Sequence, residues 1–265
     1  MRKFVAVLFA LLLGTAAAQA RVVGQEVSYD AQGVTMKGYL AYDKDIKGKR
    51  PGILVVHEWW GHNDYARKRA MMLAGLGYTA LAVDMYGDGK QADHPDDAGK
   101  FAAAVSKDLP LATARFDAAL KLLRKHATVQ ADQIAGVGYC FGGGLLLNLA
   151  RRGVDLQGIA SFHGTLASDT PAQSGKIKAK LAIFTGADDP MVPKTQVEAF
   201  ISEMRQAGVN PALTSYPGAK HAFTNPAADD YARRFNLPVA YDAEADRDSW
   251  AKLGTFLSGL FGERE

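Results

Sequence analysis

The chain has 265 residues, of which 48% are hydrophobic and 22% are charged, and this composition excludes global disorder and allows a core of ordinary size. Its 31 basic and 28 acidic residues give a formal net charge of +3 without a strong basic run, so the charge does not indicate nucleic acid or an anionic membrane as a partner. A single cysteine excludes an intramolecular disulfide.

Residues 1–20 have the layout of a secretory signal peptide. Two basic residues precede an unbroken apolar run over 4–13, and the segment ends in the small-x-small pattern Ala18-Gln19-Ala20. A membrane-spanning helix needs about 20 residues, so the run is too short to favour the alternative of an uncleaved anchor. We expect cleavage after Ala20 and export, with a periplasmic location and no stable membrane anchor. The mature chain would then hold 29 basic and 28 acidic residues.

After residue 20 the sequence alternates predicted strands with predicted helices, without internal repeats or linkers. Alternating apolar and polar residues over 22–29 and 34–41 predict an antiparallel hairpin around Gly33, at a sheet edge. Continuous apolar runs further along are typical of strands buried on both faces. In chain order the remaining predicted elements are a strand at 52–56, a helix at 64–76, a strand at 78–83, helices at 96–106 and 110–127, a strand at 134–139, a helix at 142–151, strands at 159–162 and 181–185, a helix at 196–207, a strand at 212–216 and a helix at 241–260.

This order predicts an α/β fold in which residues 21–265 form one domain. Repeated strand–helix–strand units give a mainly parallel sheet with helices on both faces. The short basic clusters at 67–69 and 151–152 are expected on solvated helix faces. Because parallel sheets place their sites at the carboxyl ends of the strands, the loops of interest are those that begin at His57, Asp84, Tyr139, His163, Gly186 and Pro217.

One of these loops has the pattern of a nucleophile elbow. Gly138-Tyr139-Cys140-Phe141-Gly142 lies between a predicted strand and a predicted helix and matches G-x-nucleophile-x-G, with Cys in place of the commoner Ser. The glycines let the strand and the helix approach closely, and the first amides of the helix favour a thiolate. The alternative is a small buried cysteine beside a glycine-rich turn. A dinucleotide-binding G-x-G-x-x-G that begins at Gly136 is excluded because position 141 is Phe.

A nucleophile of this kind needs a base, and the base needs an acid that orients it. In folds with this elbow the chain order is nucleophile, acid, histidine. Both histidines after Cys140, His163 and His221, follow a predicted strand. His221 is the expected base because a turn that follows another strand lies between it and Cys140 and can supply the acid. Asp188 and Asp189 lie between Cys140 and His221 in a Pro/Gly turn, and either is a candidate acid; each has the alternative of a turn former.

The loop at 57–64 follows the first buried strand, and in this type of fold it supplies the second oxyanion amide. His57-Glu58 resembles the start of the zinc motif H-E-x-x-H, but Gly61 stands at the fifth position and His62 is one residue late. The two histidines would not share a helical face, so we expect no metal. We expect no cofactor either.

Together these segments resemble the dienelactone hydrolase family, the carboxymethylenebutenolidases, from about Gly52 to the C-terminus. The resemblance implies an α/β-hydrolase fold and cleavage of ester or lactone bonds in small acyl substrates through a thioester acyl-enzyme. The matching segments are Glu58 with Gly61, Asp84-Met85-Tyr86, Gly138-Tyr139-Cys140-Phe141-Gly142-Gly143, Gly186-Ala187-Asp188-Asp189 with Val192-Pro193, and Gly218-Ala219-Lys220-His221-Ala222-Phe223.

The resemblance also implies the catalytic residues Cys140, Asp189 and His221. It selects Asp189 because the family's acid lies three residues after the glycine that Gly186 matches. It gives Glu58 the role of a carboxylate beside the resting thiol, which helps to deprotonate that thiol once substrate binds.

Two further roles follow from the same resemblance. The oxyanion hole is expected to consist of the amides of Trp59 and Phe141, the latter also expected from the elbow itself. Tyr86, Trp60 and Phe223 are the expected residues of the substrate pocket, although both tryptophans have the alternative of a core position.

Two departures from the family pattern argue against dienelactone as the substrate. Members that cleave dienelactone hold its carboxylate with two arginines, and the corresponding positions here are Asp88 and Asn225. Arginine and carboxylate form strong bidentate pairs, and both arginines are missing. Asp88 is expected to repel an anionic substrate.

The sequence thus predicts an exported ester or lactone hydrolase, active as a monomer or dimer. A thioesterase or acyl transferase on the same fold is one alternative, and a non-catalytic exported binding protein is another. A thiol-based redox protein is disfavoured because the chain has no C-x-x-C motif and no second cysteine.

Overall fold

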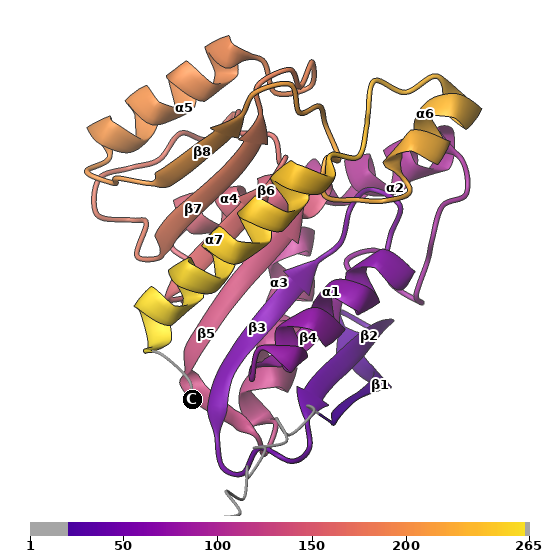
Figure 1. Cartoon of the computed structure of the whole chain (residues 1–265). Helices are drawn as coiled ribbons and strands as arrows, with labels where there is room; N and C mark the ends of the chain where they lie inside the picture. The colour runs from indigo at the N-terminus through magenta and orange to yellow at the C-terminus, as the bar shows by residue number, and fades with distance from the viewer. Residues whose placement is uncertain (1–20, 263–265) are drawn as a thin grey trace, which may run out of the picture.

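A computed structural model of the chain describes residues 21–262, so the expected leader at 1–20 and residues 263–265 lie outside the described part. Its centre is an eight-stranded sheet with the order β1-β2-β4-β3-β5-β6-β7-β8 (Figure 1). Strands β4, β3, β5, β6, β7 and β8 run parallel, whereas β1 and β2 join them in antiparallel pairing. The described fold is therefore the α/β class with the mainly parallel sheet that the sequence predicts.

The antiparallel edge is the predicted hairpin. Strands β1 (Val22–Ala31) and β2 (Val34–Asp43) pair along their whole lengths. Gln32 and Gly33 between them have φ of 55° and 80°, the left-handed conformation that a tight two-residue hairpin turn requires. Strand β1 forms the edge of the sheet, as expected.

The parallel strands end in the loops that hold the candidate site residues. Strands β3, β4, β6 and β7 and the second half of β5 are buried on both faces, which explains their continuous apolar sequences, whereas β8 at the edge of the sheet is partly exposed. Their bounds are β3 Arg50–Val56, β4 Thr79–Val83, β5 Val129–Tyr139, β6 Gly158–Phe162, β7 Lys180–Gly186 and β8 Ala212–Tyr216.

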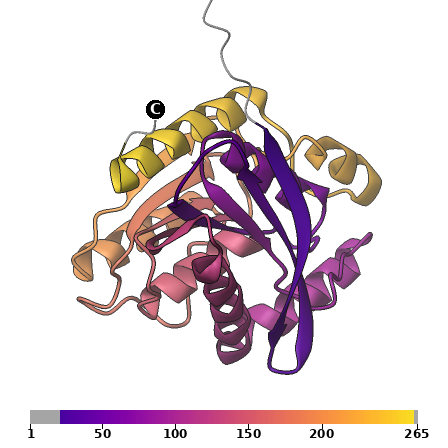
Figure 2. The same cartoon turned by 90° about the horizontal axis from the view of Figure 1, so that it is seen from below.

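Helices cover both faces of the sheet (Figure 2). Helices α1 (Asp64–Gly75) and α7 (Ala243–Phe261) bury Leu73, Leu253 and Leu257 against one face. Helices α3 (Leu109–Lys125), α4 (Phe141–Arg151) and α5 (Lys194–Gln206) pack in the core of the other face, and α2 (Pro95–Ser106) precedes α3. None of the described helices has the length and apolar character needed to cross a bilayer.

The structure departs from the predicted elements in two places. Strand β5 begins at Val129, five residues before the predicted start, because residues 130–133 extend it outside the buried core. Helix α6 (Ala228–Phe235) is not predicted at all, since its eight residues are shorter than the window of about 11 residues over which an apolar period indicates a helix. It lies beyond the carboxyl ends of the strands (Figure 1).

The prediction that both basic clusters lie on solvated helix faces is wrong for one arginine in each. Arg69 and Arg151 are only 3% and 5% exposed, and each is paired with a carboxylate, that of Asp246 and that of Glu203 respectively. Clusters of charge usually mark a solvated surface, but an arginine can be buried where a carboxylate and carbonyl oxygens satisfy its guanidinium.

Candidate active site

Cys140 occupies a strained turn between β5 and α4. Its φ of 52° lies in the left-handed region, which is costly for a residue with a side chain. A Cβ atom at Gly138 would lie 2.4 Å from the backbone of Gly142, and one at Gly142 would lie 2.4 Å from the carbonyl oxygen of Val56. Only glycine fits at these two positions, which is the steric reason that the sequence pattern suggested.

The imidazole of His221 joins Cys140 to Asp189. Its Nε2 lies 3.1 Å from Sγ of Cys140, and its Nδ1 lies 2.8 Å from Oδ2 of Asp189. The amides of Met191 and Val192 donate to the other oxygen of Asp189, at 2.8 and 3.3 Å. The Asp189 carboxylate is thus held in one orientation by the turn that follows β7.

The neighbouring candidate acid, Asp188, is exposed, whereas the side chain of Asp189 is fully buried against His221. Burial opposes a charged imidazole, but attraction to the Cys140 sulfur and the hydrogen bonds with Asp189 and Cys140 outweigh it. Together they raise the pKa of His221 to about 10. These contacts favour a protonated ring, with one N–H directed at Asp189 and the other at the sulfur.

Two backbone amides beside the sulfur are free to bind an oxyanion. Within residues 21–262, the N–H groups of Trp59 and Phe141 have no hydrogen-bond acceptor. Phe141 is the first residue of α4, and Trp59 belongs to the loop after β3. The two amides that the sequence indicated for an oxyanion hole thus have no acceptor among the described residues.

His57 fixes the backbone of the loop that carries Trp59. Its Nδ1 lies 2.5 Å from the carbonyl oxygen of Glu58, and its Nε2 lies 3.2 Å from the amide of Met85. Burial lowers the pKa of His57 to about 4, so the ring is neutral and can donate from Nδ1 while it accepts at Nε2. In the described part of the chain, no group of three or more His, Cys, Asp and Glu residues is placed to hold a metal ion.

Tyr86 supports this loop and does not line the cavity beside Cys140. Its ring packs edge-on against His57 with centroids 4.7 Å apart, and its hydroxyl donates to the carbonyl oxygen of Trp59 at 2.9 Å. Phe223 does not reach the cavity either, because it is fully buried between Tyr216 and His163 in the core beneath the site. Neither of these two residues, both expected in the substrate pocket, is among those that line this cavity, and each packs behind a loop of the site.

Glu58 is a buried carboxyl group at the wall of the cavity. Burial raises its pKa to about 7, and the hydrogen bond from Asn225 opposes this shift. Nδ2 of Asn225 donates to Oε2 of Glu58 at 2.6 Å, while Oδ1 of Asn225 accepts from the amide of Ala227 at 2.9 Å. The second contact fixes which end of the Asn225 amide faces Glu58. Asn225, noted in the sequence only for the arginine it replaces, therefore holds a candidate catalytic group.

The cavity at the sulfur is small and mostly apolar, with a volume of about 100 Å³. Trp60 lines it as predicted and stacks on Tyr231 of α6, with ring centroids 4.3 Å apart. Much of the remaining wall comes from residues 222–239, which the sequence did not indicate. Its lining residues are Glu58, Trp59, Trp60, Cys140, Met191, His221, Ala222, Tyr231, Leu237 and Val239, with no lysine or arginine among them.

Asp88 does not face this cavity. Its side chain is 59% exposed and lies 3.7 Å from the ammonium group of Lys90. Direct repulsion of an anionic substrate by Asp88, as expected from the sequence, is therefore wrong. The absence of lysine and arginine among the lining residues is what disfavours a substrate carboxylate at this cavity.

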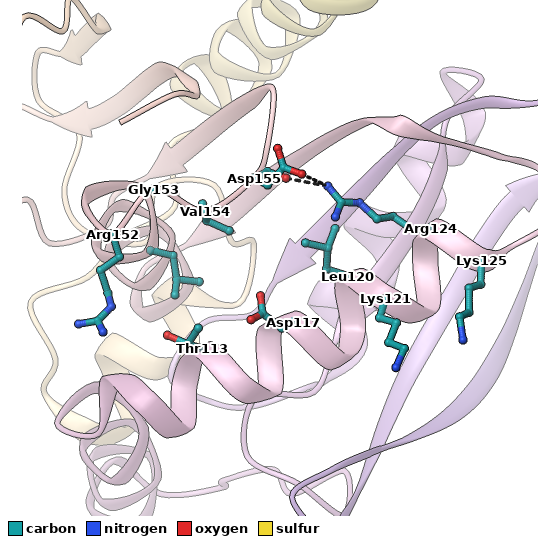
Figure 3. A pocket seen from close by; sticks show the side chains of 11 residues that line it. Thr113, Asp117, Leu120, Lys121, Arg124, Lys125, Arg152, Gly153, Val154 and Asp155 are labelled. Atoms are coloured by element: carbon teal, nitrogen blue, oxygen red, sulfur yellow. Dashed lines mark hydrogen bonds and ion pairs between the residues drawn. The ribbon is translucent and has the colours of Figure 1, made fainter. Parts of the chain in front are cut away.

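A larger hollow lies between α3 and the end of α4, with a volume of about 620 Å³ (Figure 3). Its charged groups are surface residues of both signs, and Arg124 already pairs with Asp155 at 2.7 Å. It has no histidine or cysteine in its lining, and its Gly153 and Asp155 precede β6, at the amino end of that strand. This part of the hollow therefore lies near the amino ends of the strands, whereas the elbow lies at their carboxyl ends.

Comparison with known proteins gives a consistent result. The sequence pattern of the dienelactone hydrolase family matches residues 36–261. The protein usf of Aquifex pyrophilus is 29% identical over 233 residues, which is 86% of this chain and 95% of the relative. A protein of Aquifex aeolicus assigned as a carboxymethylenebutenolidase is 27% identical over 240 residues, 89% of this chain and 98% of the relative.

A solved structure with high similarity is described as a dienelactone hydrolase-like promiscuous phosphotriesterase from metagenomic libraries. It is 33% identical, has a TM-score of 0.84, and covers 91% of this chain and 99% of its own. The family match over residues 36–261 spans the elbow, the loop after β3 and the loop of His221.

Proposed function

The chain belongs to the dienelactone hydrolase family and is a carboxylic ester hydrolase, and from this premise we propose that Cys140, His221 and Asp189 cleave small uncharged esters and lactones. The observation that carries the proposal is the position of the His221 imidazole, 3.1 Å from Sγ of Cys140 and 2.8 Å from Oδ2 of Asp189. These are the contacts that a nucleophile, its base and the orienting acid require.

In the first half of the cycle, Sγ of Cys140 attacks the carbonyl carbon and a C–S bond forms. The carbonyl oxygen becomes negatively charged and accepts hydrogen bonds from the amides of Trp59 and Phe141, each worth on the order of 3 kcal/mol. The C–O bond of the ester then breaks, and His221 gives its Nε2 proton to the leaving oxygen. A thioester on Cys140 and an alcohol result.

In the second half, His221 is neutral and takes a proton from water, which attacks the thioester carbon. The C–S bond breaks, the acid is released, and the thiolate is restored opposite the protonated imidazole. We assign Glu58 the role of proton acceptor for a Cys140 that begins the cycle as a thiol, because its pKa of about 7 suits exchange near neutral pH.

The lining of the cavity supports an uncharged acyl group. Trp60, Tyr231, Leu237 and Val239 offer apolar surface, and Glu58 is the one carboxyl group among the ten lining residues. A substrate carboxylate would lose its hydration there without gaining a lysine or arginine partner, and both ring nitrogens of His221 already face Asp189 and Cys140. We expect neutral esters to be cleaved at least about 10-fold faster than matched esters that carry a carboxylate. A 10-fold change corresponds to about 1.4 kcal/mol of free energy, and burying an unpaired charge costs well over that amount.

The test of the nucleophile is Cys140→Ala with p-nitrophenyl acetate as substrate. We expect kcat to fall about 10⁴-fold or more, because removing the nucleophile of a triad leaves only the oxyanion hole and binding. Thermal unfolding of the variant checks that the fold is retained. Turnover close to that of the unchanged enzyme would remove Cys140 from the mechanism and favour a non-catalytic role for the thiol.

A second activity is suggested by the relative described as a promiscuous phosphotriesterase. A phosphotriester is uncharged, and its P=O oxygen can occupy the same pair of amides as an ester carbonyl oxygen. We propose that the same thiolate cleaves phosphotriesters, and release of p-nitrophenol from a p-nitrophenyl phosphotriester measures it. A stoichiometric burst without turnover would show that phosphorylation of Cys140 only inactivates the enzyme.

We also propose that the enzyme acts after export, with the leader removed after Ala20. Strand β1 begins at Val22, so cleavage at that point would leave the sheet intact. Mass spectrometry of protein expressed in a bacterium with two membranes would find Arg21 at the N-terminus of a periplasmic product. An intact leader on cytoplasmic protein would overturn this part of the proposal.

A further inference from the structure

A network of buried polar side chains lies behind the loop that carries His221. Its centre is the guanidinium group of Arg69 on α1, which donates from Nη2 to Oδ1 of Asp246 on α7 at 2.5 Å. The same nitrogen donates to the carbonyl oxygen of Thr224 at 2.7 Å, and Nε donates to the hydroxyl of Tyr65 at 3.1 Å. Arg69 thus connects two helices on one face of the sheet to a single residue of the catalytic loop.

Thr224 is the point at which this network meets the site. It stands three residues after His221 and directly before Asn225, the residue that holds Glu58. The hydroxyl of Tyr65 lies 2.7 Å from the hydroxyl of Thr224 and 3.2 Å from its carbonyl oxygen. The hydroxyl and the carbonyl oxygen of Thr224 are therefore both held by hydrogen bonds with side chains of α1.

A second contact of Thr224 connects this network to the imidazole of His221. The hydroxyl of Thr224 lies 2.8 Å from Nε2 of His163, a ring that is completely buried. His163 packs edge-to-face against His221, with centroids 5.2 Å apart. A shift of Thr224 would therefore disturb His221 through the backbone and through the ring that packs against it.

Building on the proposed function, we propose that Arg69 is a positioning residue, which holds the loop from His221 to Asn225 so that the imidazole and Glu58 keep their places at Cys140. The pair of Arg69 with Asp246 is buried, with side chains 4% and 16% exposed. Burying such a pair costs desolvation, and apolar replacements often match its stability. Stability alone is thus a weak reason for an arginine here, whereas its fixed set of donors can hold a carbonyl, a hydroxyl and a carboxylate at once.

Arg151 on α4 provides a matched control. It is also buried, it pairs with Glu203 at 2.8 Å, and it donates to the carbonyl oxygen of Leu166 at 2.7 Å. It makes no hydrogen bond to the loop of His221. Arg69 and Arg151 therefore share burial, a carboxylate partner and a backbone acceptor, and they differ in the loop they hold.

The experiment compares Arg69→Lys with Arg151→Lys. Lysine keeps the charge but cannot reproduce the geometry of the guanidinium donors. Both variants are expected to lower the midpoint of thermal unfolding. Arg69→Lys should also lower kcat for p-nitrophenyl acetate about 10-fold or more with KM nearly unchanged, since small misplacements of catalytic groups are costly. Arg151→Lys should keep kcat within about 2-fold, as expected of a buried change that leaves the reacting groups in place.

A second readout does not depend on ester cleavage. The rate at which iodoacetamide alkylates Cys140, measured against pH, reports the thiolate that His221 stabilises. We expect the profile of Arg69→Lys to move to higher pH and that of Arg151→Lys to coincide with the unchanged enzyme. If the unchanged enzyme cleaves no ester, the proposed function fails while this profile still tests the role of Arg69.

Equal kcat and equal alkylation profiles in the two lysine variants would overturn the proposal and leave Arg69 a structural residue only. If Arg69→Lys does not fold, Tyr65→Phe decides instead, because it removes the hydroxyl beside Thr224 without leaving a buried charge unpaired. A lower kcat and a shifted alkylation profile in Tyr65→Phe would support the proposal. An unchanged kcat and profile in that variant would count against it.

Discussion

The cavity at Cys140 and the hollow between α3 and α4 differ in volume and in the chemistry of the residues that line them. The hollow between α3 and α4 is about six times larger than the cavity at Cys140, at about 620 against 100 Å³. Its charged residues, such as Lys121 and Arg152, are surface groups that water can screen. The small cavity instead places buried titratable groups within hydrogen-bond distance of one another, and the pKa values of Glu58 and His221 are strongly shifted.

The difference shows that volume is a poor guide to chemistry in this protein. Reactivity needs a nucleophile, a base and an orienting acid in fixed contact, with water largely excluded so that their charges act strongly. The small cavity meets these requirements with side chains from four separate loops. The larger hollow has no histidine or cysteine in its lining, and its aspartates and lysines are exposed to solvent.

The largest loss of activity is expected when the acid Asp189 is removed from the small cavity. In Asp189→Asn the shape is kept, but the neutral amide can no longer stabilise a protonated His221 or fix its orientation. We expect kcat for p-nitrophenyl acetate to fall by up to about 10⁴-fold, as happens when the acid of a triad becomes an amide.

Asp188→Asn is the matched control for that substitution. Asp188 precedes Asp189 in the same turn but is exposed, and it does not contact His221. Its kcat should stay within about 2-fold of the unchanged enzyme, because exposed substitutions away from the reacting groups cost little. A large loss in Asp188→Asn together with a small loss in Asp189→Asn would reverse the assignment of the acid.

A smaller effect is expected from Glu58→Gln. Because burial raises the pKa of Glu58 to about 7, its carboxylate form grows as the pH rises through 7. If this form accepts the proton of Cys140, kcat/KM should rise through that range, and the rise should disappear in Glu58→Gln. We expect kcat/KM at pH 8 to fall about 10²-fold, the usual size of a general-base contribution. A variant that keeps the rise would exclude Glu58 as the titrating group.

The same carboxyl group gives a prediction for stability. Its folded pKa of about 7 is above the ordinary value of 4.5, so the folded protein binds this proton more tightly than the unfolded chain. The stabilisation is therefore complete below pH 4.5 and is lost as the pH rises through 7. Denaturant unfolding of the unchanged enzyme and Glu58→Gln across this range should show that difference, and a constant difference would contradict it.

Asn225→Ala should change the enzyme less. The hydrogen bond from Asn225 lowers the pKa of Glu58, so its removal should move the rise in kcat/KM to higher pH. At pH 7 we expect a several-fold loss, since a shift of one pKa unit changes the ionised fraction by up to 10-fold. Asn148→Ala, on α4 and in contact with Arg151, is a control that should leave the profile in place.

The smallest effect is expected in the larger hollow. Lys121→Ala combined with Arg152→Ala removes two of its cations without touching the cavity at Cys140. We expect kcat and KM for neutral esters to stay within about 2-fold of the unchanged enzyme, because surface charges this far from the reaction are largely screened. A strong change in either constant would show that the hollow communicates with the active site.

The sequence predicted the sheet and the position of the elbow because both depend on local patterns. Buried parallel strands leave continuous apolar runs, and the elbow needs glycine at 138 and 142 for steric reasons that the structure confirms. The approach of His221 to Cys140 was also expected, since each residue follows a strand of the same parallel sheet.

The sequence did not reveal the features that depend on contacts between distant segments. The wall formed by Tyr231 and Leu237 belongs to the short helix α6 and the segment that follows it, which are brought to the site by contacts with distant residues such as Trp60. Arg69 looked like part of a solvated basic cluster, and its burial depends on Asp246, 177 residues away. Phe223 was expected in the pocket, but its ring is fully buried against His163 and Tyr216, directly after a turn in which Ala222 has φ of 60°.

The most direct test of the account is the identity of the atom that carries the acyl group. The enzyme is mixed rapidly with p-nitrophenyl acetate, quenched in acid, digested and examined by mass spectrometry. The account predicts one acetyl group on the peptide that contains Cys140, formed and lost at rates that support steady turnover, and its absence in Cys140→Ala. Steady ester cleavage with no acyl group on Cys140 would contradict it.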